Sequence, residues 1–267
     1  MLNFDKIKKS KKLILIAGPC VIENEKTTFE IAKKLKIISN KFEIPFIFKA
    51  SYQKANRTKW NSYSGPGIDK GLEILKKIKD DLHLALTTDV HSVNDVKKVN
   101  KIIDIIQIPA FLSRQTDILV AAAKTNKIIN VKKAPFLSGE SCKFILQKIN
   151  KSGNLNTIIT ERGNSFGYHN LIVDMRNIPI IKKNNVPVII DATHSNQKPN
   201  QKTGKSGGTP KFIETIACAG IASGADGVFV ETHPNPSLSL SDGSNMLKID
   251  KLEPLIEKLI AIKKIIN

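Results

Sequence analysis

Short apolar runs rich in β-branched residues alternate along the chain with longer segments whose apolar residues recur at helical spacing. Such alternation is typical of βα units, in which an amphipathic helix covers a buried parallel strand. The eight apolar runs are residues 13–17, 45–50, 84–88, 105–110, 128–132, 157–160, 186–190 and 227–230. Eight units in 267 residues match the roughly 250 residues of one (β/α)8, or TIM, barrel. We therefore predict this barrel, with a doubly wound open sheet as the alternative.

No proline- or serine-rich linker and no change in composition divides the chain, so we expect a single domain over residues 1–267. Residues 1–12 form a short N-terminal extension, which is basic and leads into only five apolar residues. That run is too short for the hydrophobic region of a signal peptide. The three cysteines are an odd number, which argues against a disulfide framework. We therefore expect a cytoplasmic protein.

The chain is strongly basic, with 42 Lys and Arg against 24 Asp and Glu and a formal net charge of +18. This excess suits nucleic acid, anionic lipid or phosphorylated small molecules as partners. However, the lysines are spread through every predicted helix, whereas nucleic-acid-binding proteins cluster their charge on one face. A nucleic-acid-binding protein, which would show salt-dependent binding to DNA or RNA, is therefore the weaker alternative. We expect neither a nucleic acid nor a membrane as partner.

Polar side chains occur at the point where each predicted strand ends. They are Cys20; Lys49 and Ser51; Asp89 and His91; Gln107; Lys132 and Lys133; Glu161 and Arg162; Asp191 and His194; and Glu231 and His233. In a barrel these strand ends form one concave face, where the catalytic groups lie. Several lysines and an arginine that converge there need an anion to offset their charge. The sequence therefore predicts a small, multiply charged substrate, and the glycine-rich segment 203–209 is a candidate lid over it.

Four residues at the same predicted mouth could bind a metal ion. They are Cys20, His194, Glu231 and Asp242, the last in the loop after the final strand. A thiolate, an imidazole and two carboxylates suit zinc, iron(II), manganese or a similar divalent ion. Taken singly, each residue has an ordinary structural explanation, such as a buried cysteine or a turn-forming aspartate. Their joint placement at strand ends favours one divalent metal ion per subunit.

Long motifs spread over nearly the whole chain point to a known family. They are IAGPCVIE (16–23), FKASYQKANRTKWNSYSGPG (48–67), TDVH (88–91), IIQIPAFLSRQTD (105–117), INVKK (129–133), ERGNSFGYHNLIVDMR (161–176), DATHS (191–195), KSGG (205–208) and VFVETHP (228–234). Through them the chain resembles the 3-deoxy-D-manno-octulosonate 8-phosphate synthases. The resemblance implies a (β/α)8 barrel, usually a homotetramer, and a transferase that joins phosphoenolpyruvate to D-arabinose 5-phosphate in lipopolysaccharide biosynthesis.

The resemblance also implies roles for individual residues. Members with Cys after Gly-Pro depend on a metal ion and members with Asn do not, so the expected ligands are Cys20, His194, Glu231 and Asp242. The residues matched to phosphoenolpyruvate are Lys49, Ser51, Lys54, Gln107, Lys132 and Arg162. Those matched to the sugar phosphate are Asn56, Arg57 and Thr58, with Arg114 reaching in from a neighbouring subunit. Those expected to take part in catalysis are Lys54, Lys132, His194 and Asp242.

The expected acceptor sugar follows from the segment KANR, residues 54–57. The comparable segment of the related 3-deoxy-D-arabino-heptulosonate 7-phosphate synthases resembles KPRTS, so KANR favours arabinose 5-phosphate. A heptulosonate synthase that uses erythrose 4-phosphate is the alternative. Three residues depart from the family's pattern: Thr58 in place of Ser, Ser64 in place of Arg and Pro135 in place of Gln. Thr58 keeps the hydroxyl, and the other two bear on loop packing or affinity. Whether the ion acts on the aldehyde or on water stays open.

Overall fold

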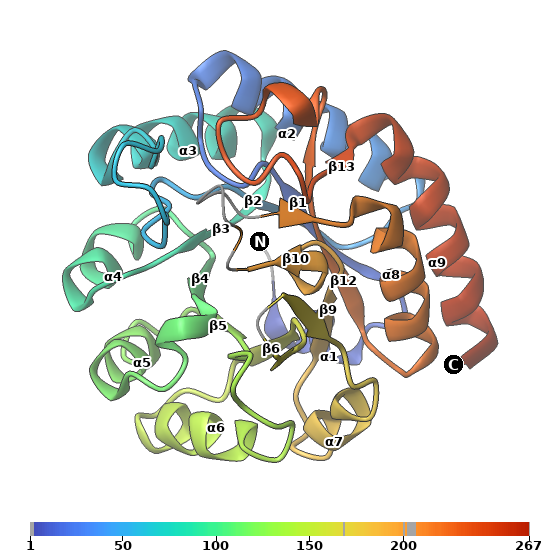
Figure 1. The fold of residues 1–267 in the computed structure, drawn as a ribbon. Helices are drawn as coiled ribbons and strands as arrows, with labels where there is room; N and C mark the ends of the chain where they lie inside the picture. Colours follow the sequence, from blue (N-terminus) through green and yellow to red (C-terminus); the bar gives the residue numbers. More distant parts are fainter. Residues whose placement is uncertain (1–2, 168, 200, 202–206, 267) are drawn as a thin grey trace.

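A computed structural model describes residues 3–167, 169–199, 201 and 207–266 of the chain. Within these residues, parallel strands form a closed barrel (Figure 1). The barrel strands are β1 (Ile14–Gly18), β2 (Phe46–Lys49), β3 (Ala85–Asp89), β4 (Ile105–Ile108), β5 (Ile128–Lys132), β6 (Thr157–Glu161), β9 (Val188–Asp191) and β12 (Gly227–His233). Each pairs with the next, and β12 pairs back with β1. This closure confirms the predicted TIM barrel and excludes the open sheet.

Helices form a ring around the barrel (Figure 1). Those that follow the barrel strands are α2 (Glu25–Lys41), α3 (Ile68–Leu82), α4 (Val93–Val99), α5 (Thr116–Ala123), α6 (Cys142–Lys151), α7 (Asn177–Lys182), α8 (Ile213–Ala222) and α9 (Leu252–Ile266). The apolar face of α2 carries Ile31, Leu35 and Ile38, which are buried against the strands. The helix begins where the side chain of Asn24 accepts a hydrogen bond from the amide of Thr27. None of the described helices is long and apolar enough to cross a membrane.

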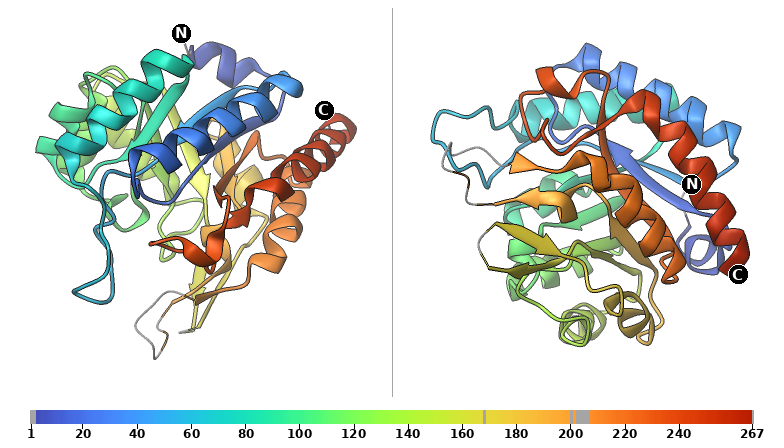
Figure 2. Two further views of the ribbon diagram at one scale, coloured as in Figure 1. Left: turned by 90° about the horizontal axis from the view of Figure 1, so that it is seen from above. Right: turned by 45° about the vertical axis from the view of Figure 1, so that its right-hand side comes forward.

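The predicted N-terminal extension contains a helix, α1 (Phe4–Lys9), which the sequence analysis did not foresee. Its N-cap is Asn3, whose side chain accepts hydrogen bonds from two backbone amides of the first turn. Phe4 and Ile7 are buried against apolar side chains of the barrel interior, namely Ile14, Ile16, Ile47, Ile105, Ile128, Ile158, Ile189 and Phe229. Figure 2 shows α1 at the end of the barrel opposite the long loops. The helix therefore closes one end, and a substrate must enter from the other.

Small strands extend the loops at the open end. They are the hairpin β7 (Asn164–Phe166) and β8 (Asn170–Ile172), the ladder β10 (Gln197–Lys198) and β11 (Gly207–Gly208), and β13 (Leu247–Lys248), which pairs with β12. Of the candidate lid 203–209, residues 203–206 lie outside the described part of the chain. The fourth predicted strand ends earlier than expected, at Ile108. Pro109 follows it and has no N–H to continue the ladder, and a 3-10 turn, η1 (Ala110–Leu112), comes next.

Candidate active site

A pocket of about 350 Å³ lies at the carboxyl ends of the barrel strands. The predicted site residues that line it are Cys20, Lys49, Ser51, Lys54, Asn56, Gln107, Lys132, Arg162, His194 and Glu231. A second pocket, of about 580 Å³, is lined in part by Arg57, Thr58 and Asp242. The two pockets adjoin, because the ammonium group of Lys54 in the first bonds Asp242 in the second. Arg114 is exposed and lines neither pocket within this chain.

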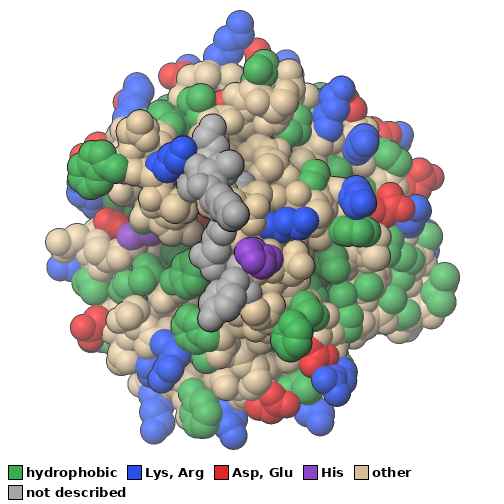
Figure 3. Space-filling model, viewed as in Figure 1, with side chains coloured by type: hydrophobic (Ala, Val, Ile, Leu, Met, Phe, Trp, Pro, Cys, Tyr) green, Lys and Arg blue, Asp and Glu red, His purple; other side chains and the backbone are tan. Residues whose placement is uncertain are grey.

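The positive charge of the chain is not concentrated on this face. Among the described residues in Figure 3, Lys and Arg side chains are scattered around the outline and leave wide stretches of other residues between them. The cations that matter for a small anionic substrate lie inside the pocket instead. Lys49, Lys132 and Arg162 are each less than a tenth exposed. Charged groups are rarely buried to this extent unless they are paired or bind a ligand.

Cys20 enters the site because the first two strands approach closely at Gly18. A Cβ atom at this position would lie 1.9 Å from the backbone oxygen of Lys49, so any other residue would push the strands apart. The chain then turns through Gly-Pro and buries the Cys20 side chain. Its Sγ accepts a hydrogen bond from Lys54 Nζ at 3.1 Å and lies 3.3 Å from Ser241 Oγ. The thiol therefore faces the loop that follows β12.

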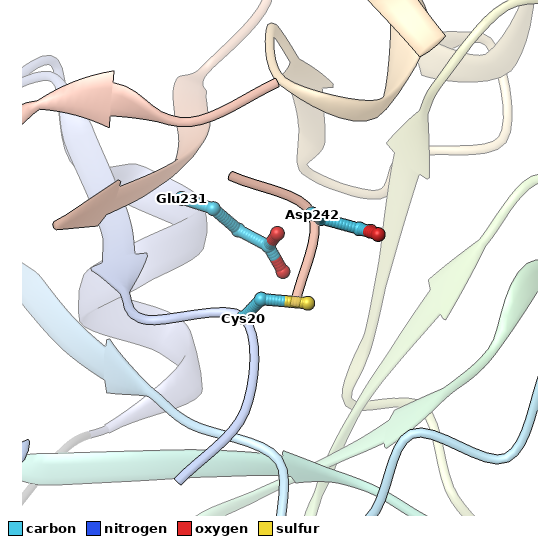
Figure 4. A group of neighbouring side chains, drawn as sticks. All are labelled: Cys20, Glu231 and Asp242. Carbon is cyan, nitrogen blue, oxygen red and sulfur yellow. The ribbon is translucent and has the colours of Figure 1, made fainter. Parts of the chain in front are cut away.

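Three of the four predicted metal ligands lie together (Figure 4). Cys20, Glu231 and Asp242 each offer one ligand atom, and these atoms lie within 4.8 Å of one another. Glu231 belongs to β12. Asp242 lies in the following loop with φ of +46°, a left-handed conformation that aspartate tolerates better than most residues. The fourth predicted ligand, His194, lies beside this group, with Nε2 3.4 Å from Glu231 Oε2.

The chemistry of this group fits a divalent cation. Glu231 Oε2 is buried without a hydrogen-bond partner among the described residues, which leaves a carboxylate oxygen to be satisfied. Burial and the nearby charge of Glu231 raise the pKa of the Cys20 thiol to about 12. A cation beside the sulfur is therefore needed to hold it as a thiolate. Lys54 supplies positive charge there, since its ammonium group bonds both Cys20 and Asp242.

Lys49 connects the predicted metal ligands to the rest of the pocket. Its Nζ donates to Glu231 Oε1 and to the backbone oxygen of Cys20, each at 2.9 Å, and lies 3.6 Å from Asp89 Oδ2. Burial by itself would lower the pKa of this amine, but the charges of Glu231 and Asp89 outweigh burial and raise the pKa above its usual value. Lys49 therefore stays protonated and can bind an anion.

Lys132 is the cation at the centre of the pocket. Its Nζ lies 3.1 Å from the ring centroid of Phe229 and donates a hydrogen bond to Asp191. Burial lowers the pKa of Lys132 to about 8, because the charge of Asp191 offsets only part of the desolvation. An anionic substrate would raise this pKa and stabilise the protonated form further. Asp191 also bonds Nδ1 of His194 at 2.8 Å, which turns Nε2 of the ring toward Glu231.

Gln197 is a site residue that sequence reasoning missed. Arg162 Nη2 donates to Gln197 Oε1 at 2.9 Å, and Gln197 Nε2 donates to Asp242 Oδ2 at 3.1 Å. The Gln197 amide therefore links Arg162, which is predicted to bind phosphoenolpyruvate, to Asp242, which is predicted to bind the metal ion. Nothing in the apolar pattern marks Gln197, because it lies six residues beyond the end of β9. Asp191, by contrast, stands directly at the end of an apolar run, where polar residues are expected in a barrel site.

The predicted sugar-phosphate segment lies at the rim of the pocket. Arg57 Nη1 donates to Ser241 Oγ at 3.0 Å and lies 3.7 Å from Asp242 Oδ1, while Asn56 and Thr58 are exposed. Ser64 departs from the family's pattern, but its backbone oxygen still accepts a hydrogen bond from the amide of Lys54 at 2.7 Å. The same holds at Pro135, whose backbone oxygen accepts from the amide of Ser165 at 2.8 Å. Both loops are therefore held independently of the changed side chains.

Comparison with known proteins gives the family. The DAHP synthetase I family matches residues 5–267, and the chain belongs to this family. A 2-dehydro-3-deoxyphosphooctonate aldolase of Geotalea daltonii is 49% identical over 262 residues, which cover 98% of this chain and 96% of the relative. The protein of the same name from Geobacter sulfurreducens is 47% identical over 262 residues, with the same coverage. That from Syntrophobacter fumaroxidans is 45% identical over 258 residues, 97% of this chain and 90% of the relative.

The names of these relatives bear on the two types of enzyme that the sequence left as alternatives. Phosphooctonate is the eight-carbon product, whereas a heptulosonate synthase makes a seven-carbon one. The names therefore confirm the prediction of an octulosonate-type enzyme over the heptulosonate alternative. They also confirm the family resemblance on which the residue assignments were based.

Proposed function

We propose that the protein is a cytoplasmic transferase that condenses phosphoenolpyruvate with D-arabinose 5-phosphate and water. The products are 3-deoxy-D-manno-octulosonate 8-phosphate and inorganic phosphate, and the step leads towards lipopolysaccharide. One observation carries the proposal: a pocket in which Lys49, Lys132 and Arg162 are buried beside a thiol, an imidazole and two carboxylates. Such a pocket can bind two substrates that each carry one phosphate group, beside the proposed metal ligands.

The buried cations bind and orient phosphoenolpyruvate. Lys49, Lys132 and Arg162 offer charge-assisted hydrogen bonds to its carboxylate and phosphate, and Ser51 and Gln107 line the same wall. This arrangement aims the enol carbon at the aldehyde of the sugar phosphate. A carbon–carbon bond forms between them, water adds at C2 of the former enol, and phosphate leaves with cleavage of the C2–O bond.

The chain also supplies groups that move protons. The aldehyde oxygen takes up a proton as it becomes a hydroxyl, and the water that adds at C2 loses one. Lys54 is a proton donor beside Asp242, and the imidazole of His194 lines the pocket, held by Asp191 with Nε2 toward Glu231. We propose that Cys20, His194, Glu231 and Asp242 hold one divalent ion per subunit. When bound, such an ion would polarise the aldehyde or lower the pKa of water.

Phosphate release with each aldose tests the proposed reaction. We expect kcat/KM with arabinose 5-phosphate to exceed that with erythrose 4-phosphate by about 100-fold or more, because a site built for one set of hydroxyls leaves polar groups unpaired with the shorter sugar. The measurement is inorganic phosphate released from phosphoenolpyruvate, with a control that lacks any aldose. Similar values of kcat/KM for the two sugars would contradict the assignment.

We propose further that the protein works as a homotetramer in which Arg114 completes the site of a neighbouring subunit. Arg114 is exposed and lines neither of the two pockets described above, although Phe111 and Leu112 just before it line the active-site pocket. The Arg114→Ala variant should raise the KM for arabinose 5-phosphate by about 10- to 100-fold, the loss expected for one hydrogen bond to a charged group. Sedimentation should show an unchanged tetramer.

Mixed subunits give a sharper test of the shared site. Arg114→Ala subunits keep Lys132, and Lys132→Met subunits keep Arg114, so a mixed tetramer contains sites with both residues. Co-expression of the two variants should therefore restore high affinity for the sugar phosphate in part of the sites. If activity of the mixture is only the average of the separate variants, Arg114 does not act across an interface.

A further inference from the structure

A row of hydrogen-bonded side chains crosses the barrel from β6 to the loop after β2. Thr160 Oγ1 donates to Asn130 Oδ1 at 2.7 Å. Asn130 Nδ2 donates to Gln107 Oε1 at 2.9 Å, and Gln107 Nε2 donates to Asp89 Oδ1 at 2.8 Å. Ser51 Oγ donates to the other oxygen of Asp89 at 2.6 Å. The row therefore joins residues of four neighbouring strands, β6, β5, β4 and β3, to one residue of the β2 loop.

The row begins in the packed interior and ends in the active site. Asn130 and Thr160 are fully buried and do not line the pocket, whereas Gln107, Asp89 and Ser51 do. Asn130 is flanked along β5 by apolar residues that pack in the core. Burying an amide costs free energy unless its polar groups are hydrogen-bonded, so packing alone does not explain an asparagine at this position. The hydrogen bonds of Asn130 to Thr160 and Gln107 do explain it.

Each bond of the row has only one possible direction. Lys49 near Asp89 Oδ2 and the donors Ser51 and Gln107 outweigh burial and hold the pKa of Asp89 well below its usual value, so this carboxylate only accepts. Gln107 must then turn its NH2 group to Asp89 and its carbonyl to Asn130. Asn130 in turn must direct its NH2 group to Gln107 and its carbonyl to Thr160. The carboxylate of Asp89 thus sets the direction of both amides, and the hydroxyl of Thr160 supplies the donor that the Asn130 carbonyl then requires.

We propose that Asn130 and Thr160 are positioning residues for the phosphoenolpyruvate site. They hold the Gln107 amide with its nitrogen toward the pocket. One hydrogen of that nitrogen bonds Asp89, and the second is left as a donor for the anionic substrate. Asp89, at the other end of the row, accepts the hydrogen bond of the Ser51 hydroxyl, and its Oδ2 lies 3.6 Å from Lys49 Nζ. This inference rests on the proposed function, because it assigns the pocket wall to phosphoenolpyruvate.

The pair Thr160→Val and Thr160→Ser tests the proposal at the start of the row. Valine has the shape of threonine but cannot donate to Asn130, so the Asn130 carbonyl is left buried without its donor and the row is held less firmly. We expect the Kd for phosphoenolpyruvate to rise about 10-fold. Thr160→Ser keeps the hydroxyl and should bind within about 2-fold of the native protein. Calorimetric titration with phosphoenolpyruvate alone measures both values without turnover.

A matched control lies on the same strand. Thr157 is also fully buried in β6, but its hydroxyl has no hydrogen-bond partner among the described residues. Thr157→Val therefore makes the same chemical change outside the row, and its Kd for phosphoenolpyruvate should stay that of the native protein. Equal weakening in Thr157→Val and Thr160→Val would assign the effect to the strand and overturn the proposal, as would native affinity in Thr160→Val.

Asn130→Asp tests the middle of the row with a variant of the same size. The carboxylate cannot donate to Gln107, so the Gln107 carbonyl loses its donor and faces a second acceptor, while a turned amide would place that carbonyl against Asp89. We expect weaker binding of phosphoenolpyruvate than in Thr160→Val, and no further loss when the two changes are combined, since both act through one amide. Additive losses would overturn the proposal. If the native protein binds phosphoenolpyruvate but releases no phosphate with either aldose, the proposed function fails while this inference stands.

Discussion

We expect excess chelator to abolish turnover while the barrel stays folded, and a divalent metal ion to restore turnover. This expectation rests on the proposed ligands Cys20, His194, Glu231 and Asp242. The thiol has a pKa of about 12 in its buried site, so it becomes a thiolate ligand only with a cation beside it. Phosphate release should fall by more than about 100-fold, since loss of even an indirect metal contact costs 10- to 100-fold. Circular dichroism follows the fold.

Variants of Cys20 separate metal binding from packing. Cys20→Ala should lose the ion and turnover together, as measured by elemental analysis and phosphate release. Cys20→Asn imitates the metal-independent members of the family and should keep some activity that resists chelator. Cys142→Ala is the control, because Cys142 is equally buried but lies at the start of α6, away from the pocket. Undiminished turnover by metal-free native protein would show that Cys20 only packs.

Lys132→Met should lower kcat/KM for phosphoenolpyruvate by about 100- to 1,000-fold. The substitution removes a buried cation that faces the substrate and takes away one partner of Asp191, and such changes cost about 2–5 kcal/mol. Asp191 keeps its bond to His194, so the barrel should stay folded. Steady-state kinetics with varied phosphoenolpyruvate gives the ratio.

The control for Lys132→Met is Lys124→Met, which removes the same charge from an exposed position. This variant should keep native kinetics, because surface charges are screened and contribute little. A loss of less than 10-fold in Lys132→Met would mean that Lys132 does not bind the substrate. A similar loss in both variants would instead assign the effect to the net charge of the protein.

The barrel could be predicted because its strands are buried on both faces and therefore form continuous apolar runs. The helix α1 could not be, since only Phe4 and Ile7 of its six residues are buried and helical spacing cannot be recognised over so short a segment. The same reason hides β10 and β11, which are two residues each and depend on the return of a distant segment.

The site was predictable where a polar residue stands at the end of an apolar run, as Lys49 and Glu231 do. It was not where the residue lies in a loop that folds back over the mouth. Gln197 and Ser241 belong to such loops, and their contacts depend on how the loops close. Asn130 and Thr160 were visible as polar residues within apolar runs, but spacing along the chain does not say that the strand order makes them neighbours.

The seam between β1 and β12 joins the first and last strands of the barrel, and the predicted metal ligands Cys20 and Glu231 lie on its two sides. Cys20 and Ser241, which touch at this seam, are 221 residues apart. Contacts of such long range are typical of slow-folding topologies, because a long loop must close before they can form. An ion held by Cys20 and Asp242 would bind only the closed barrel and stabilise it by about 2.7 kcal/mol at a free concentration about 100 times its Kd. Metal supply would then set the free energy of unfolding of the protein as well as its activity.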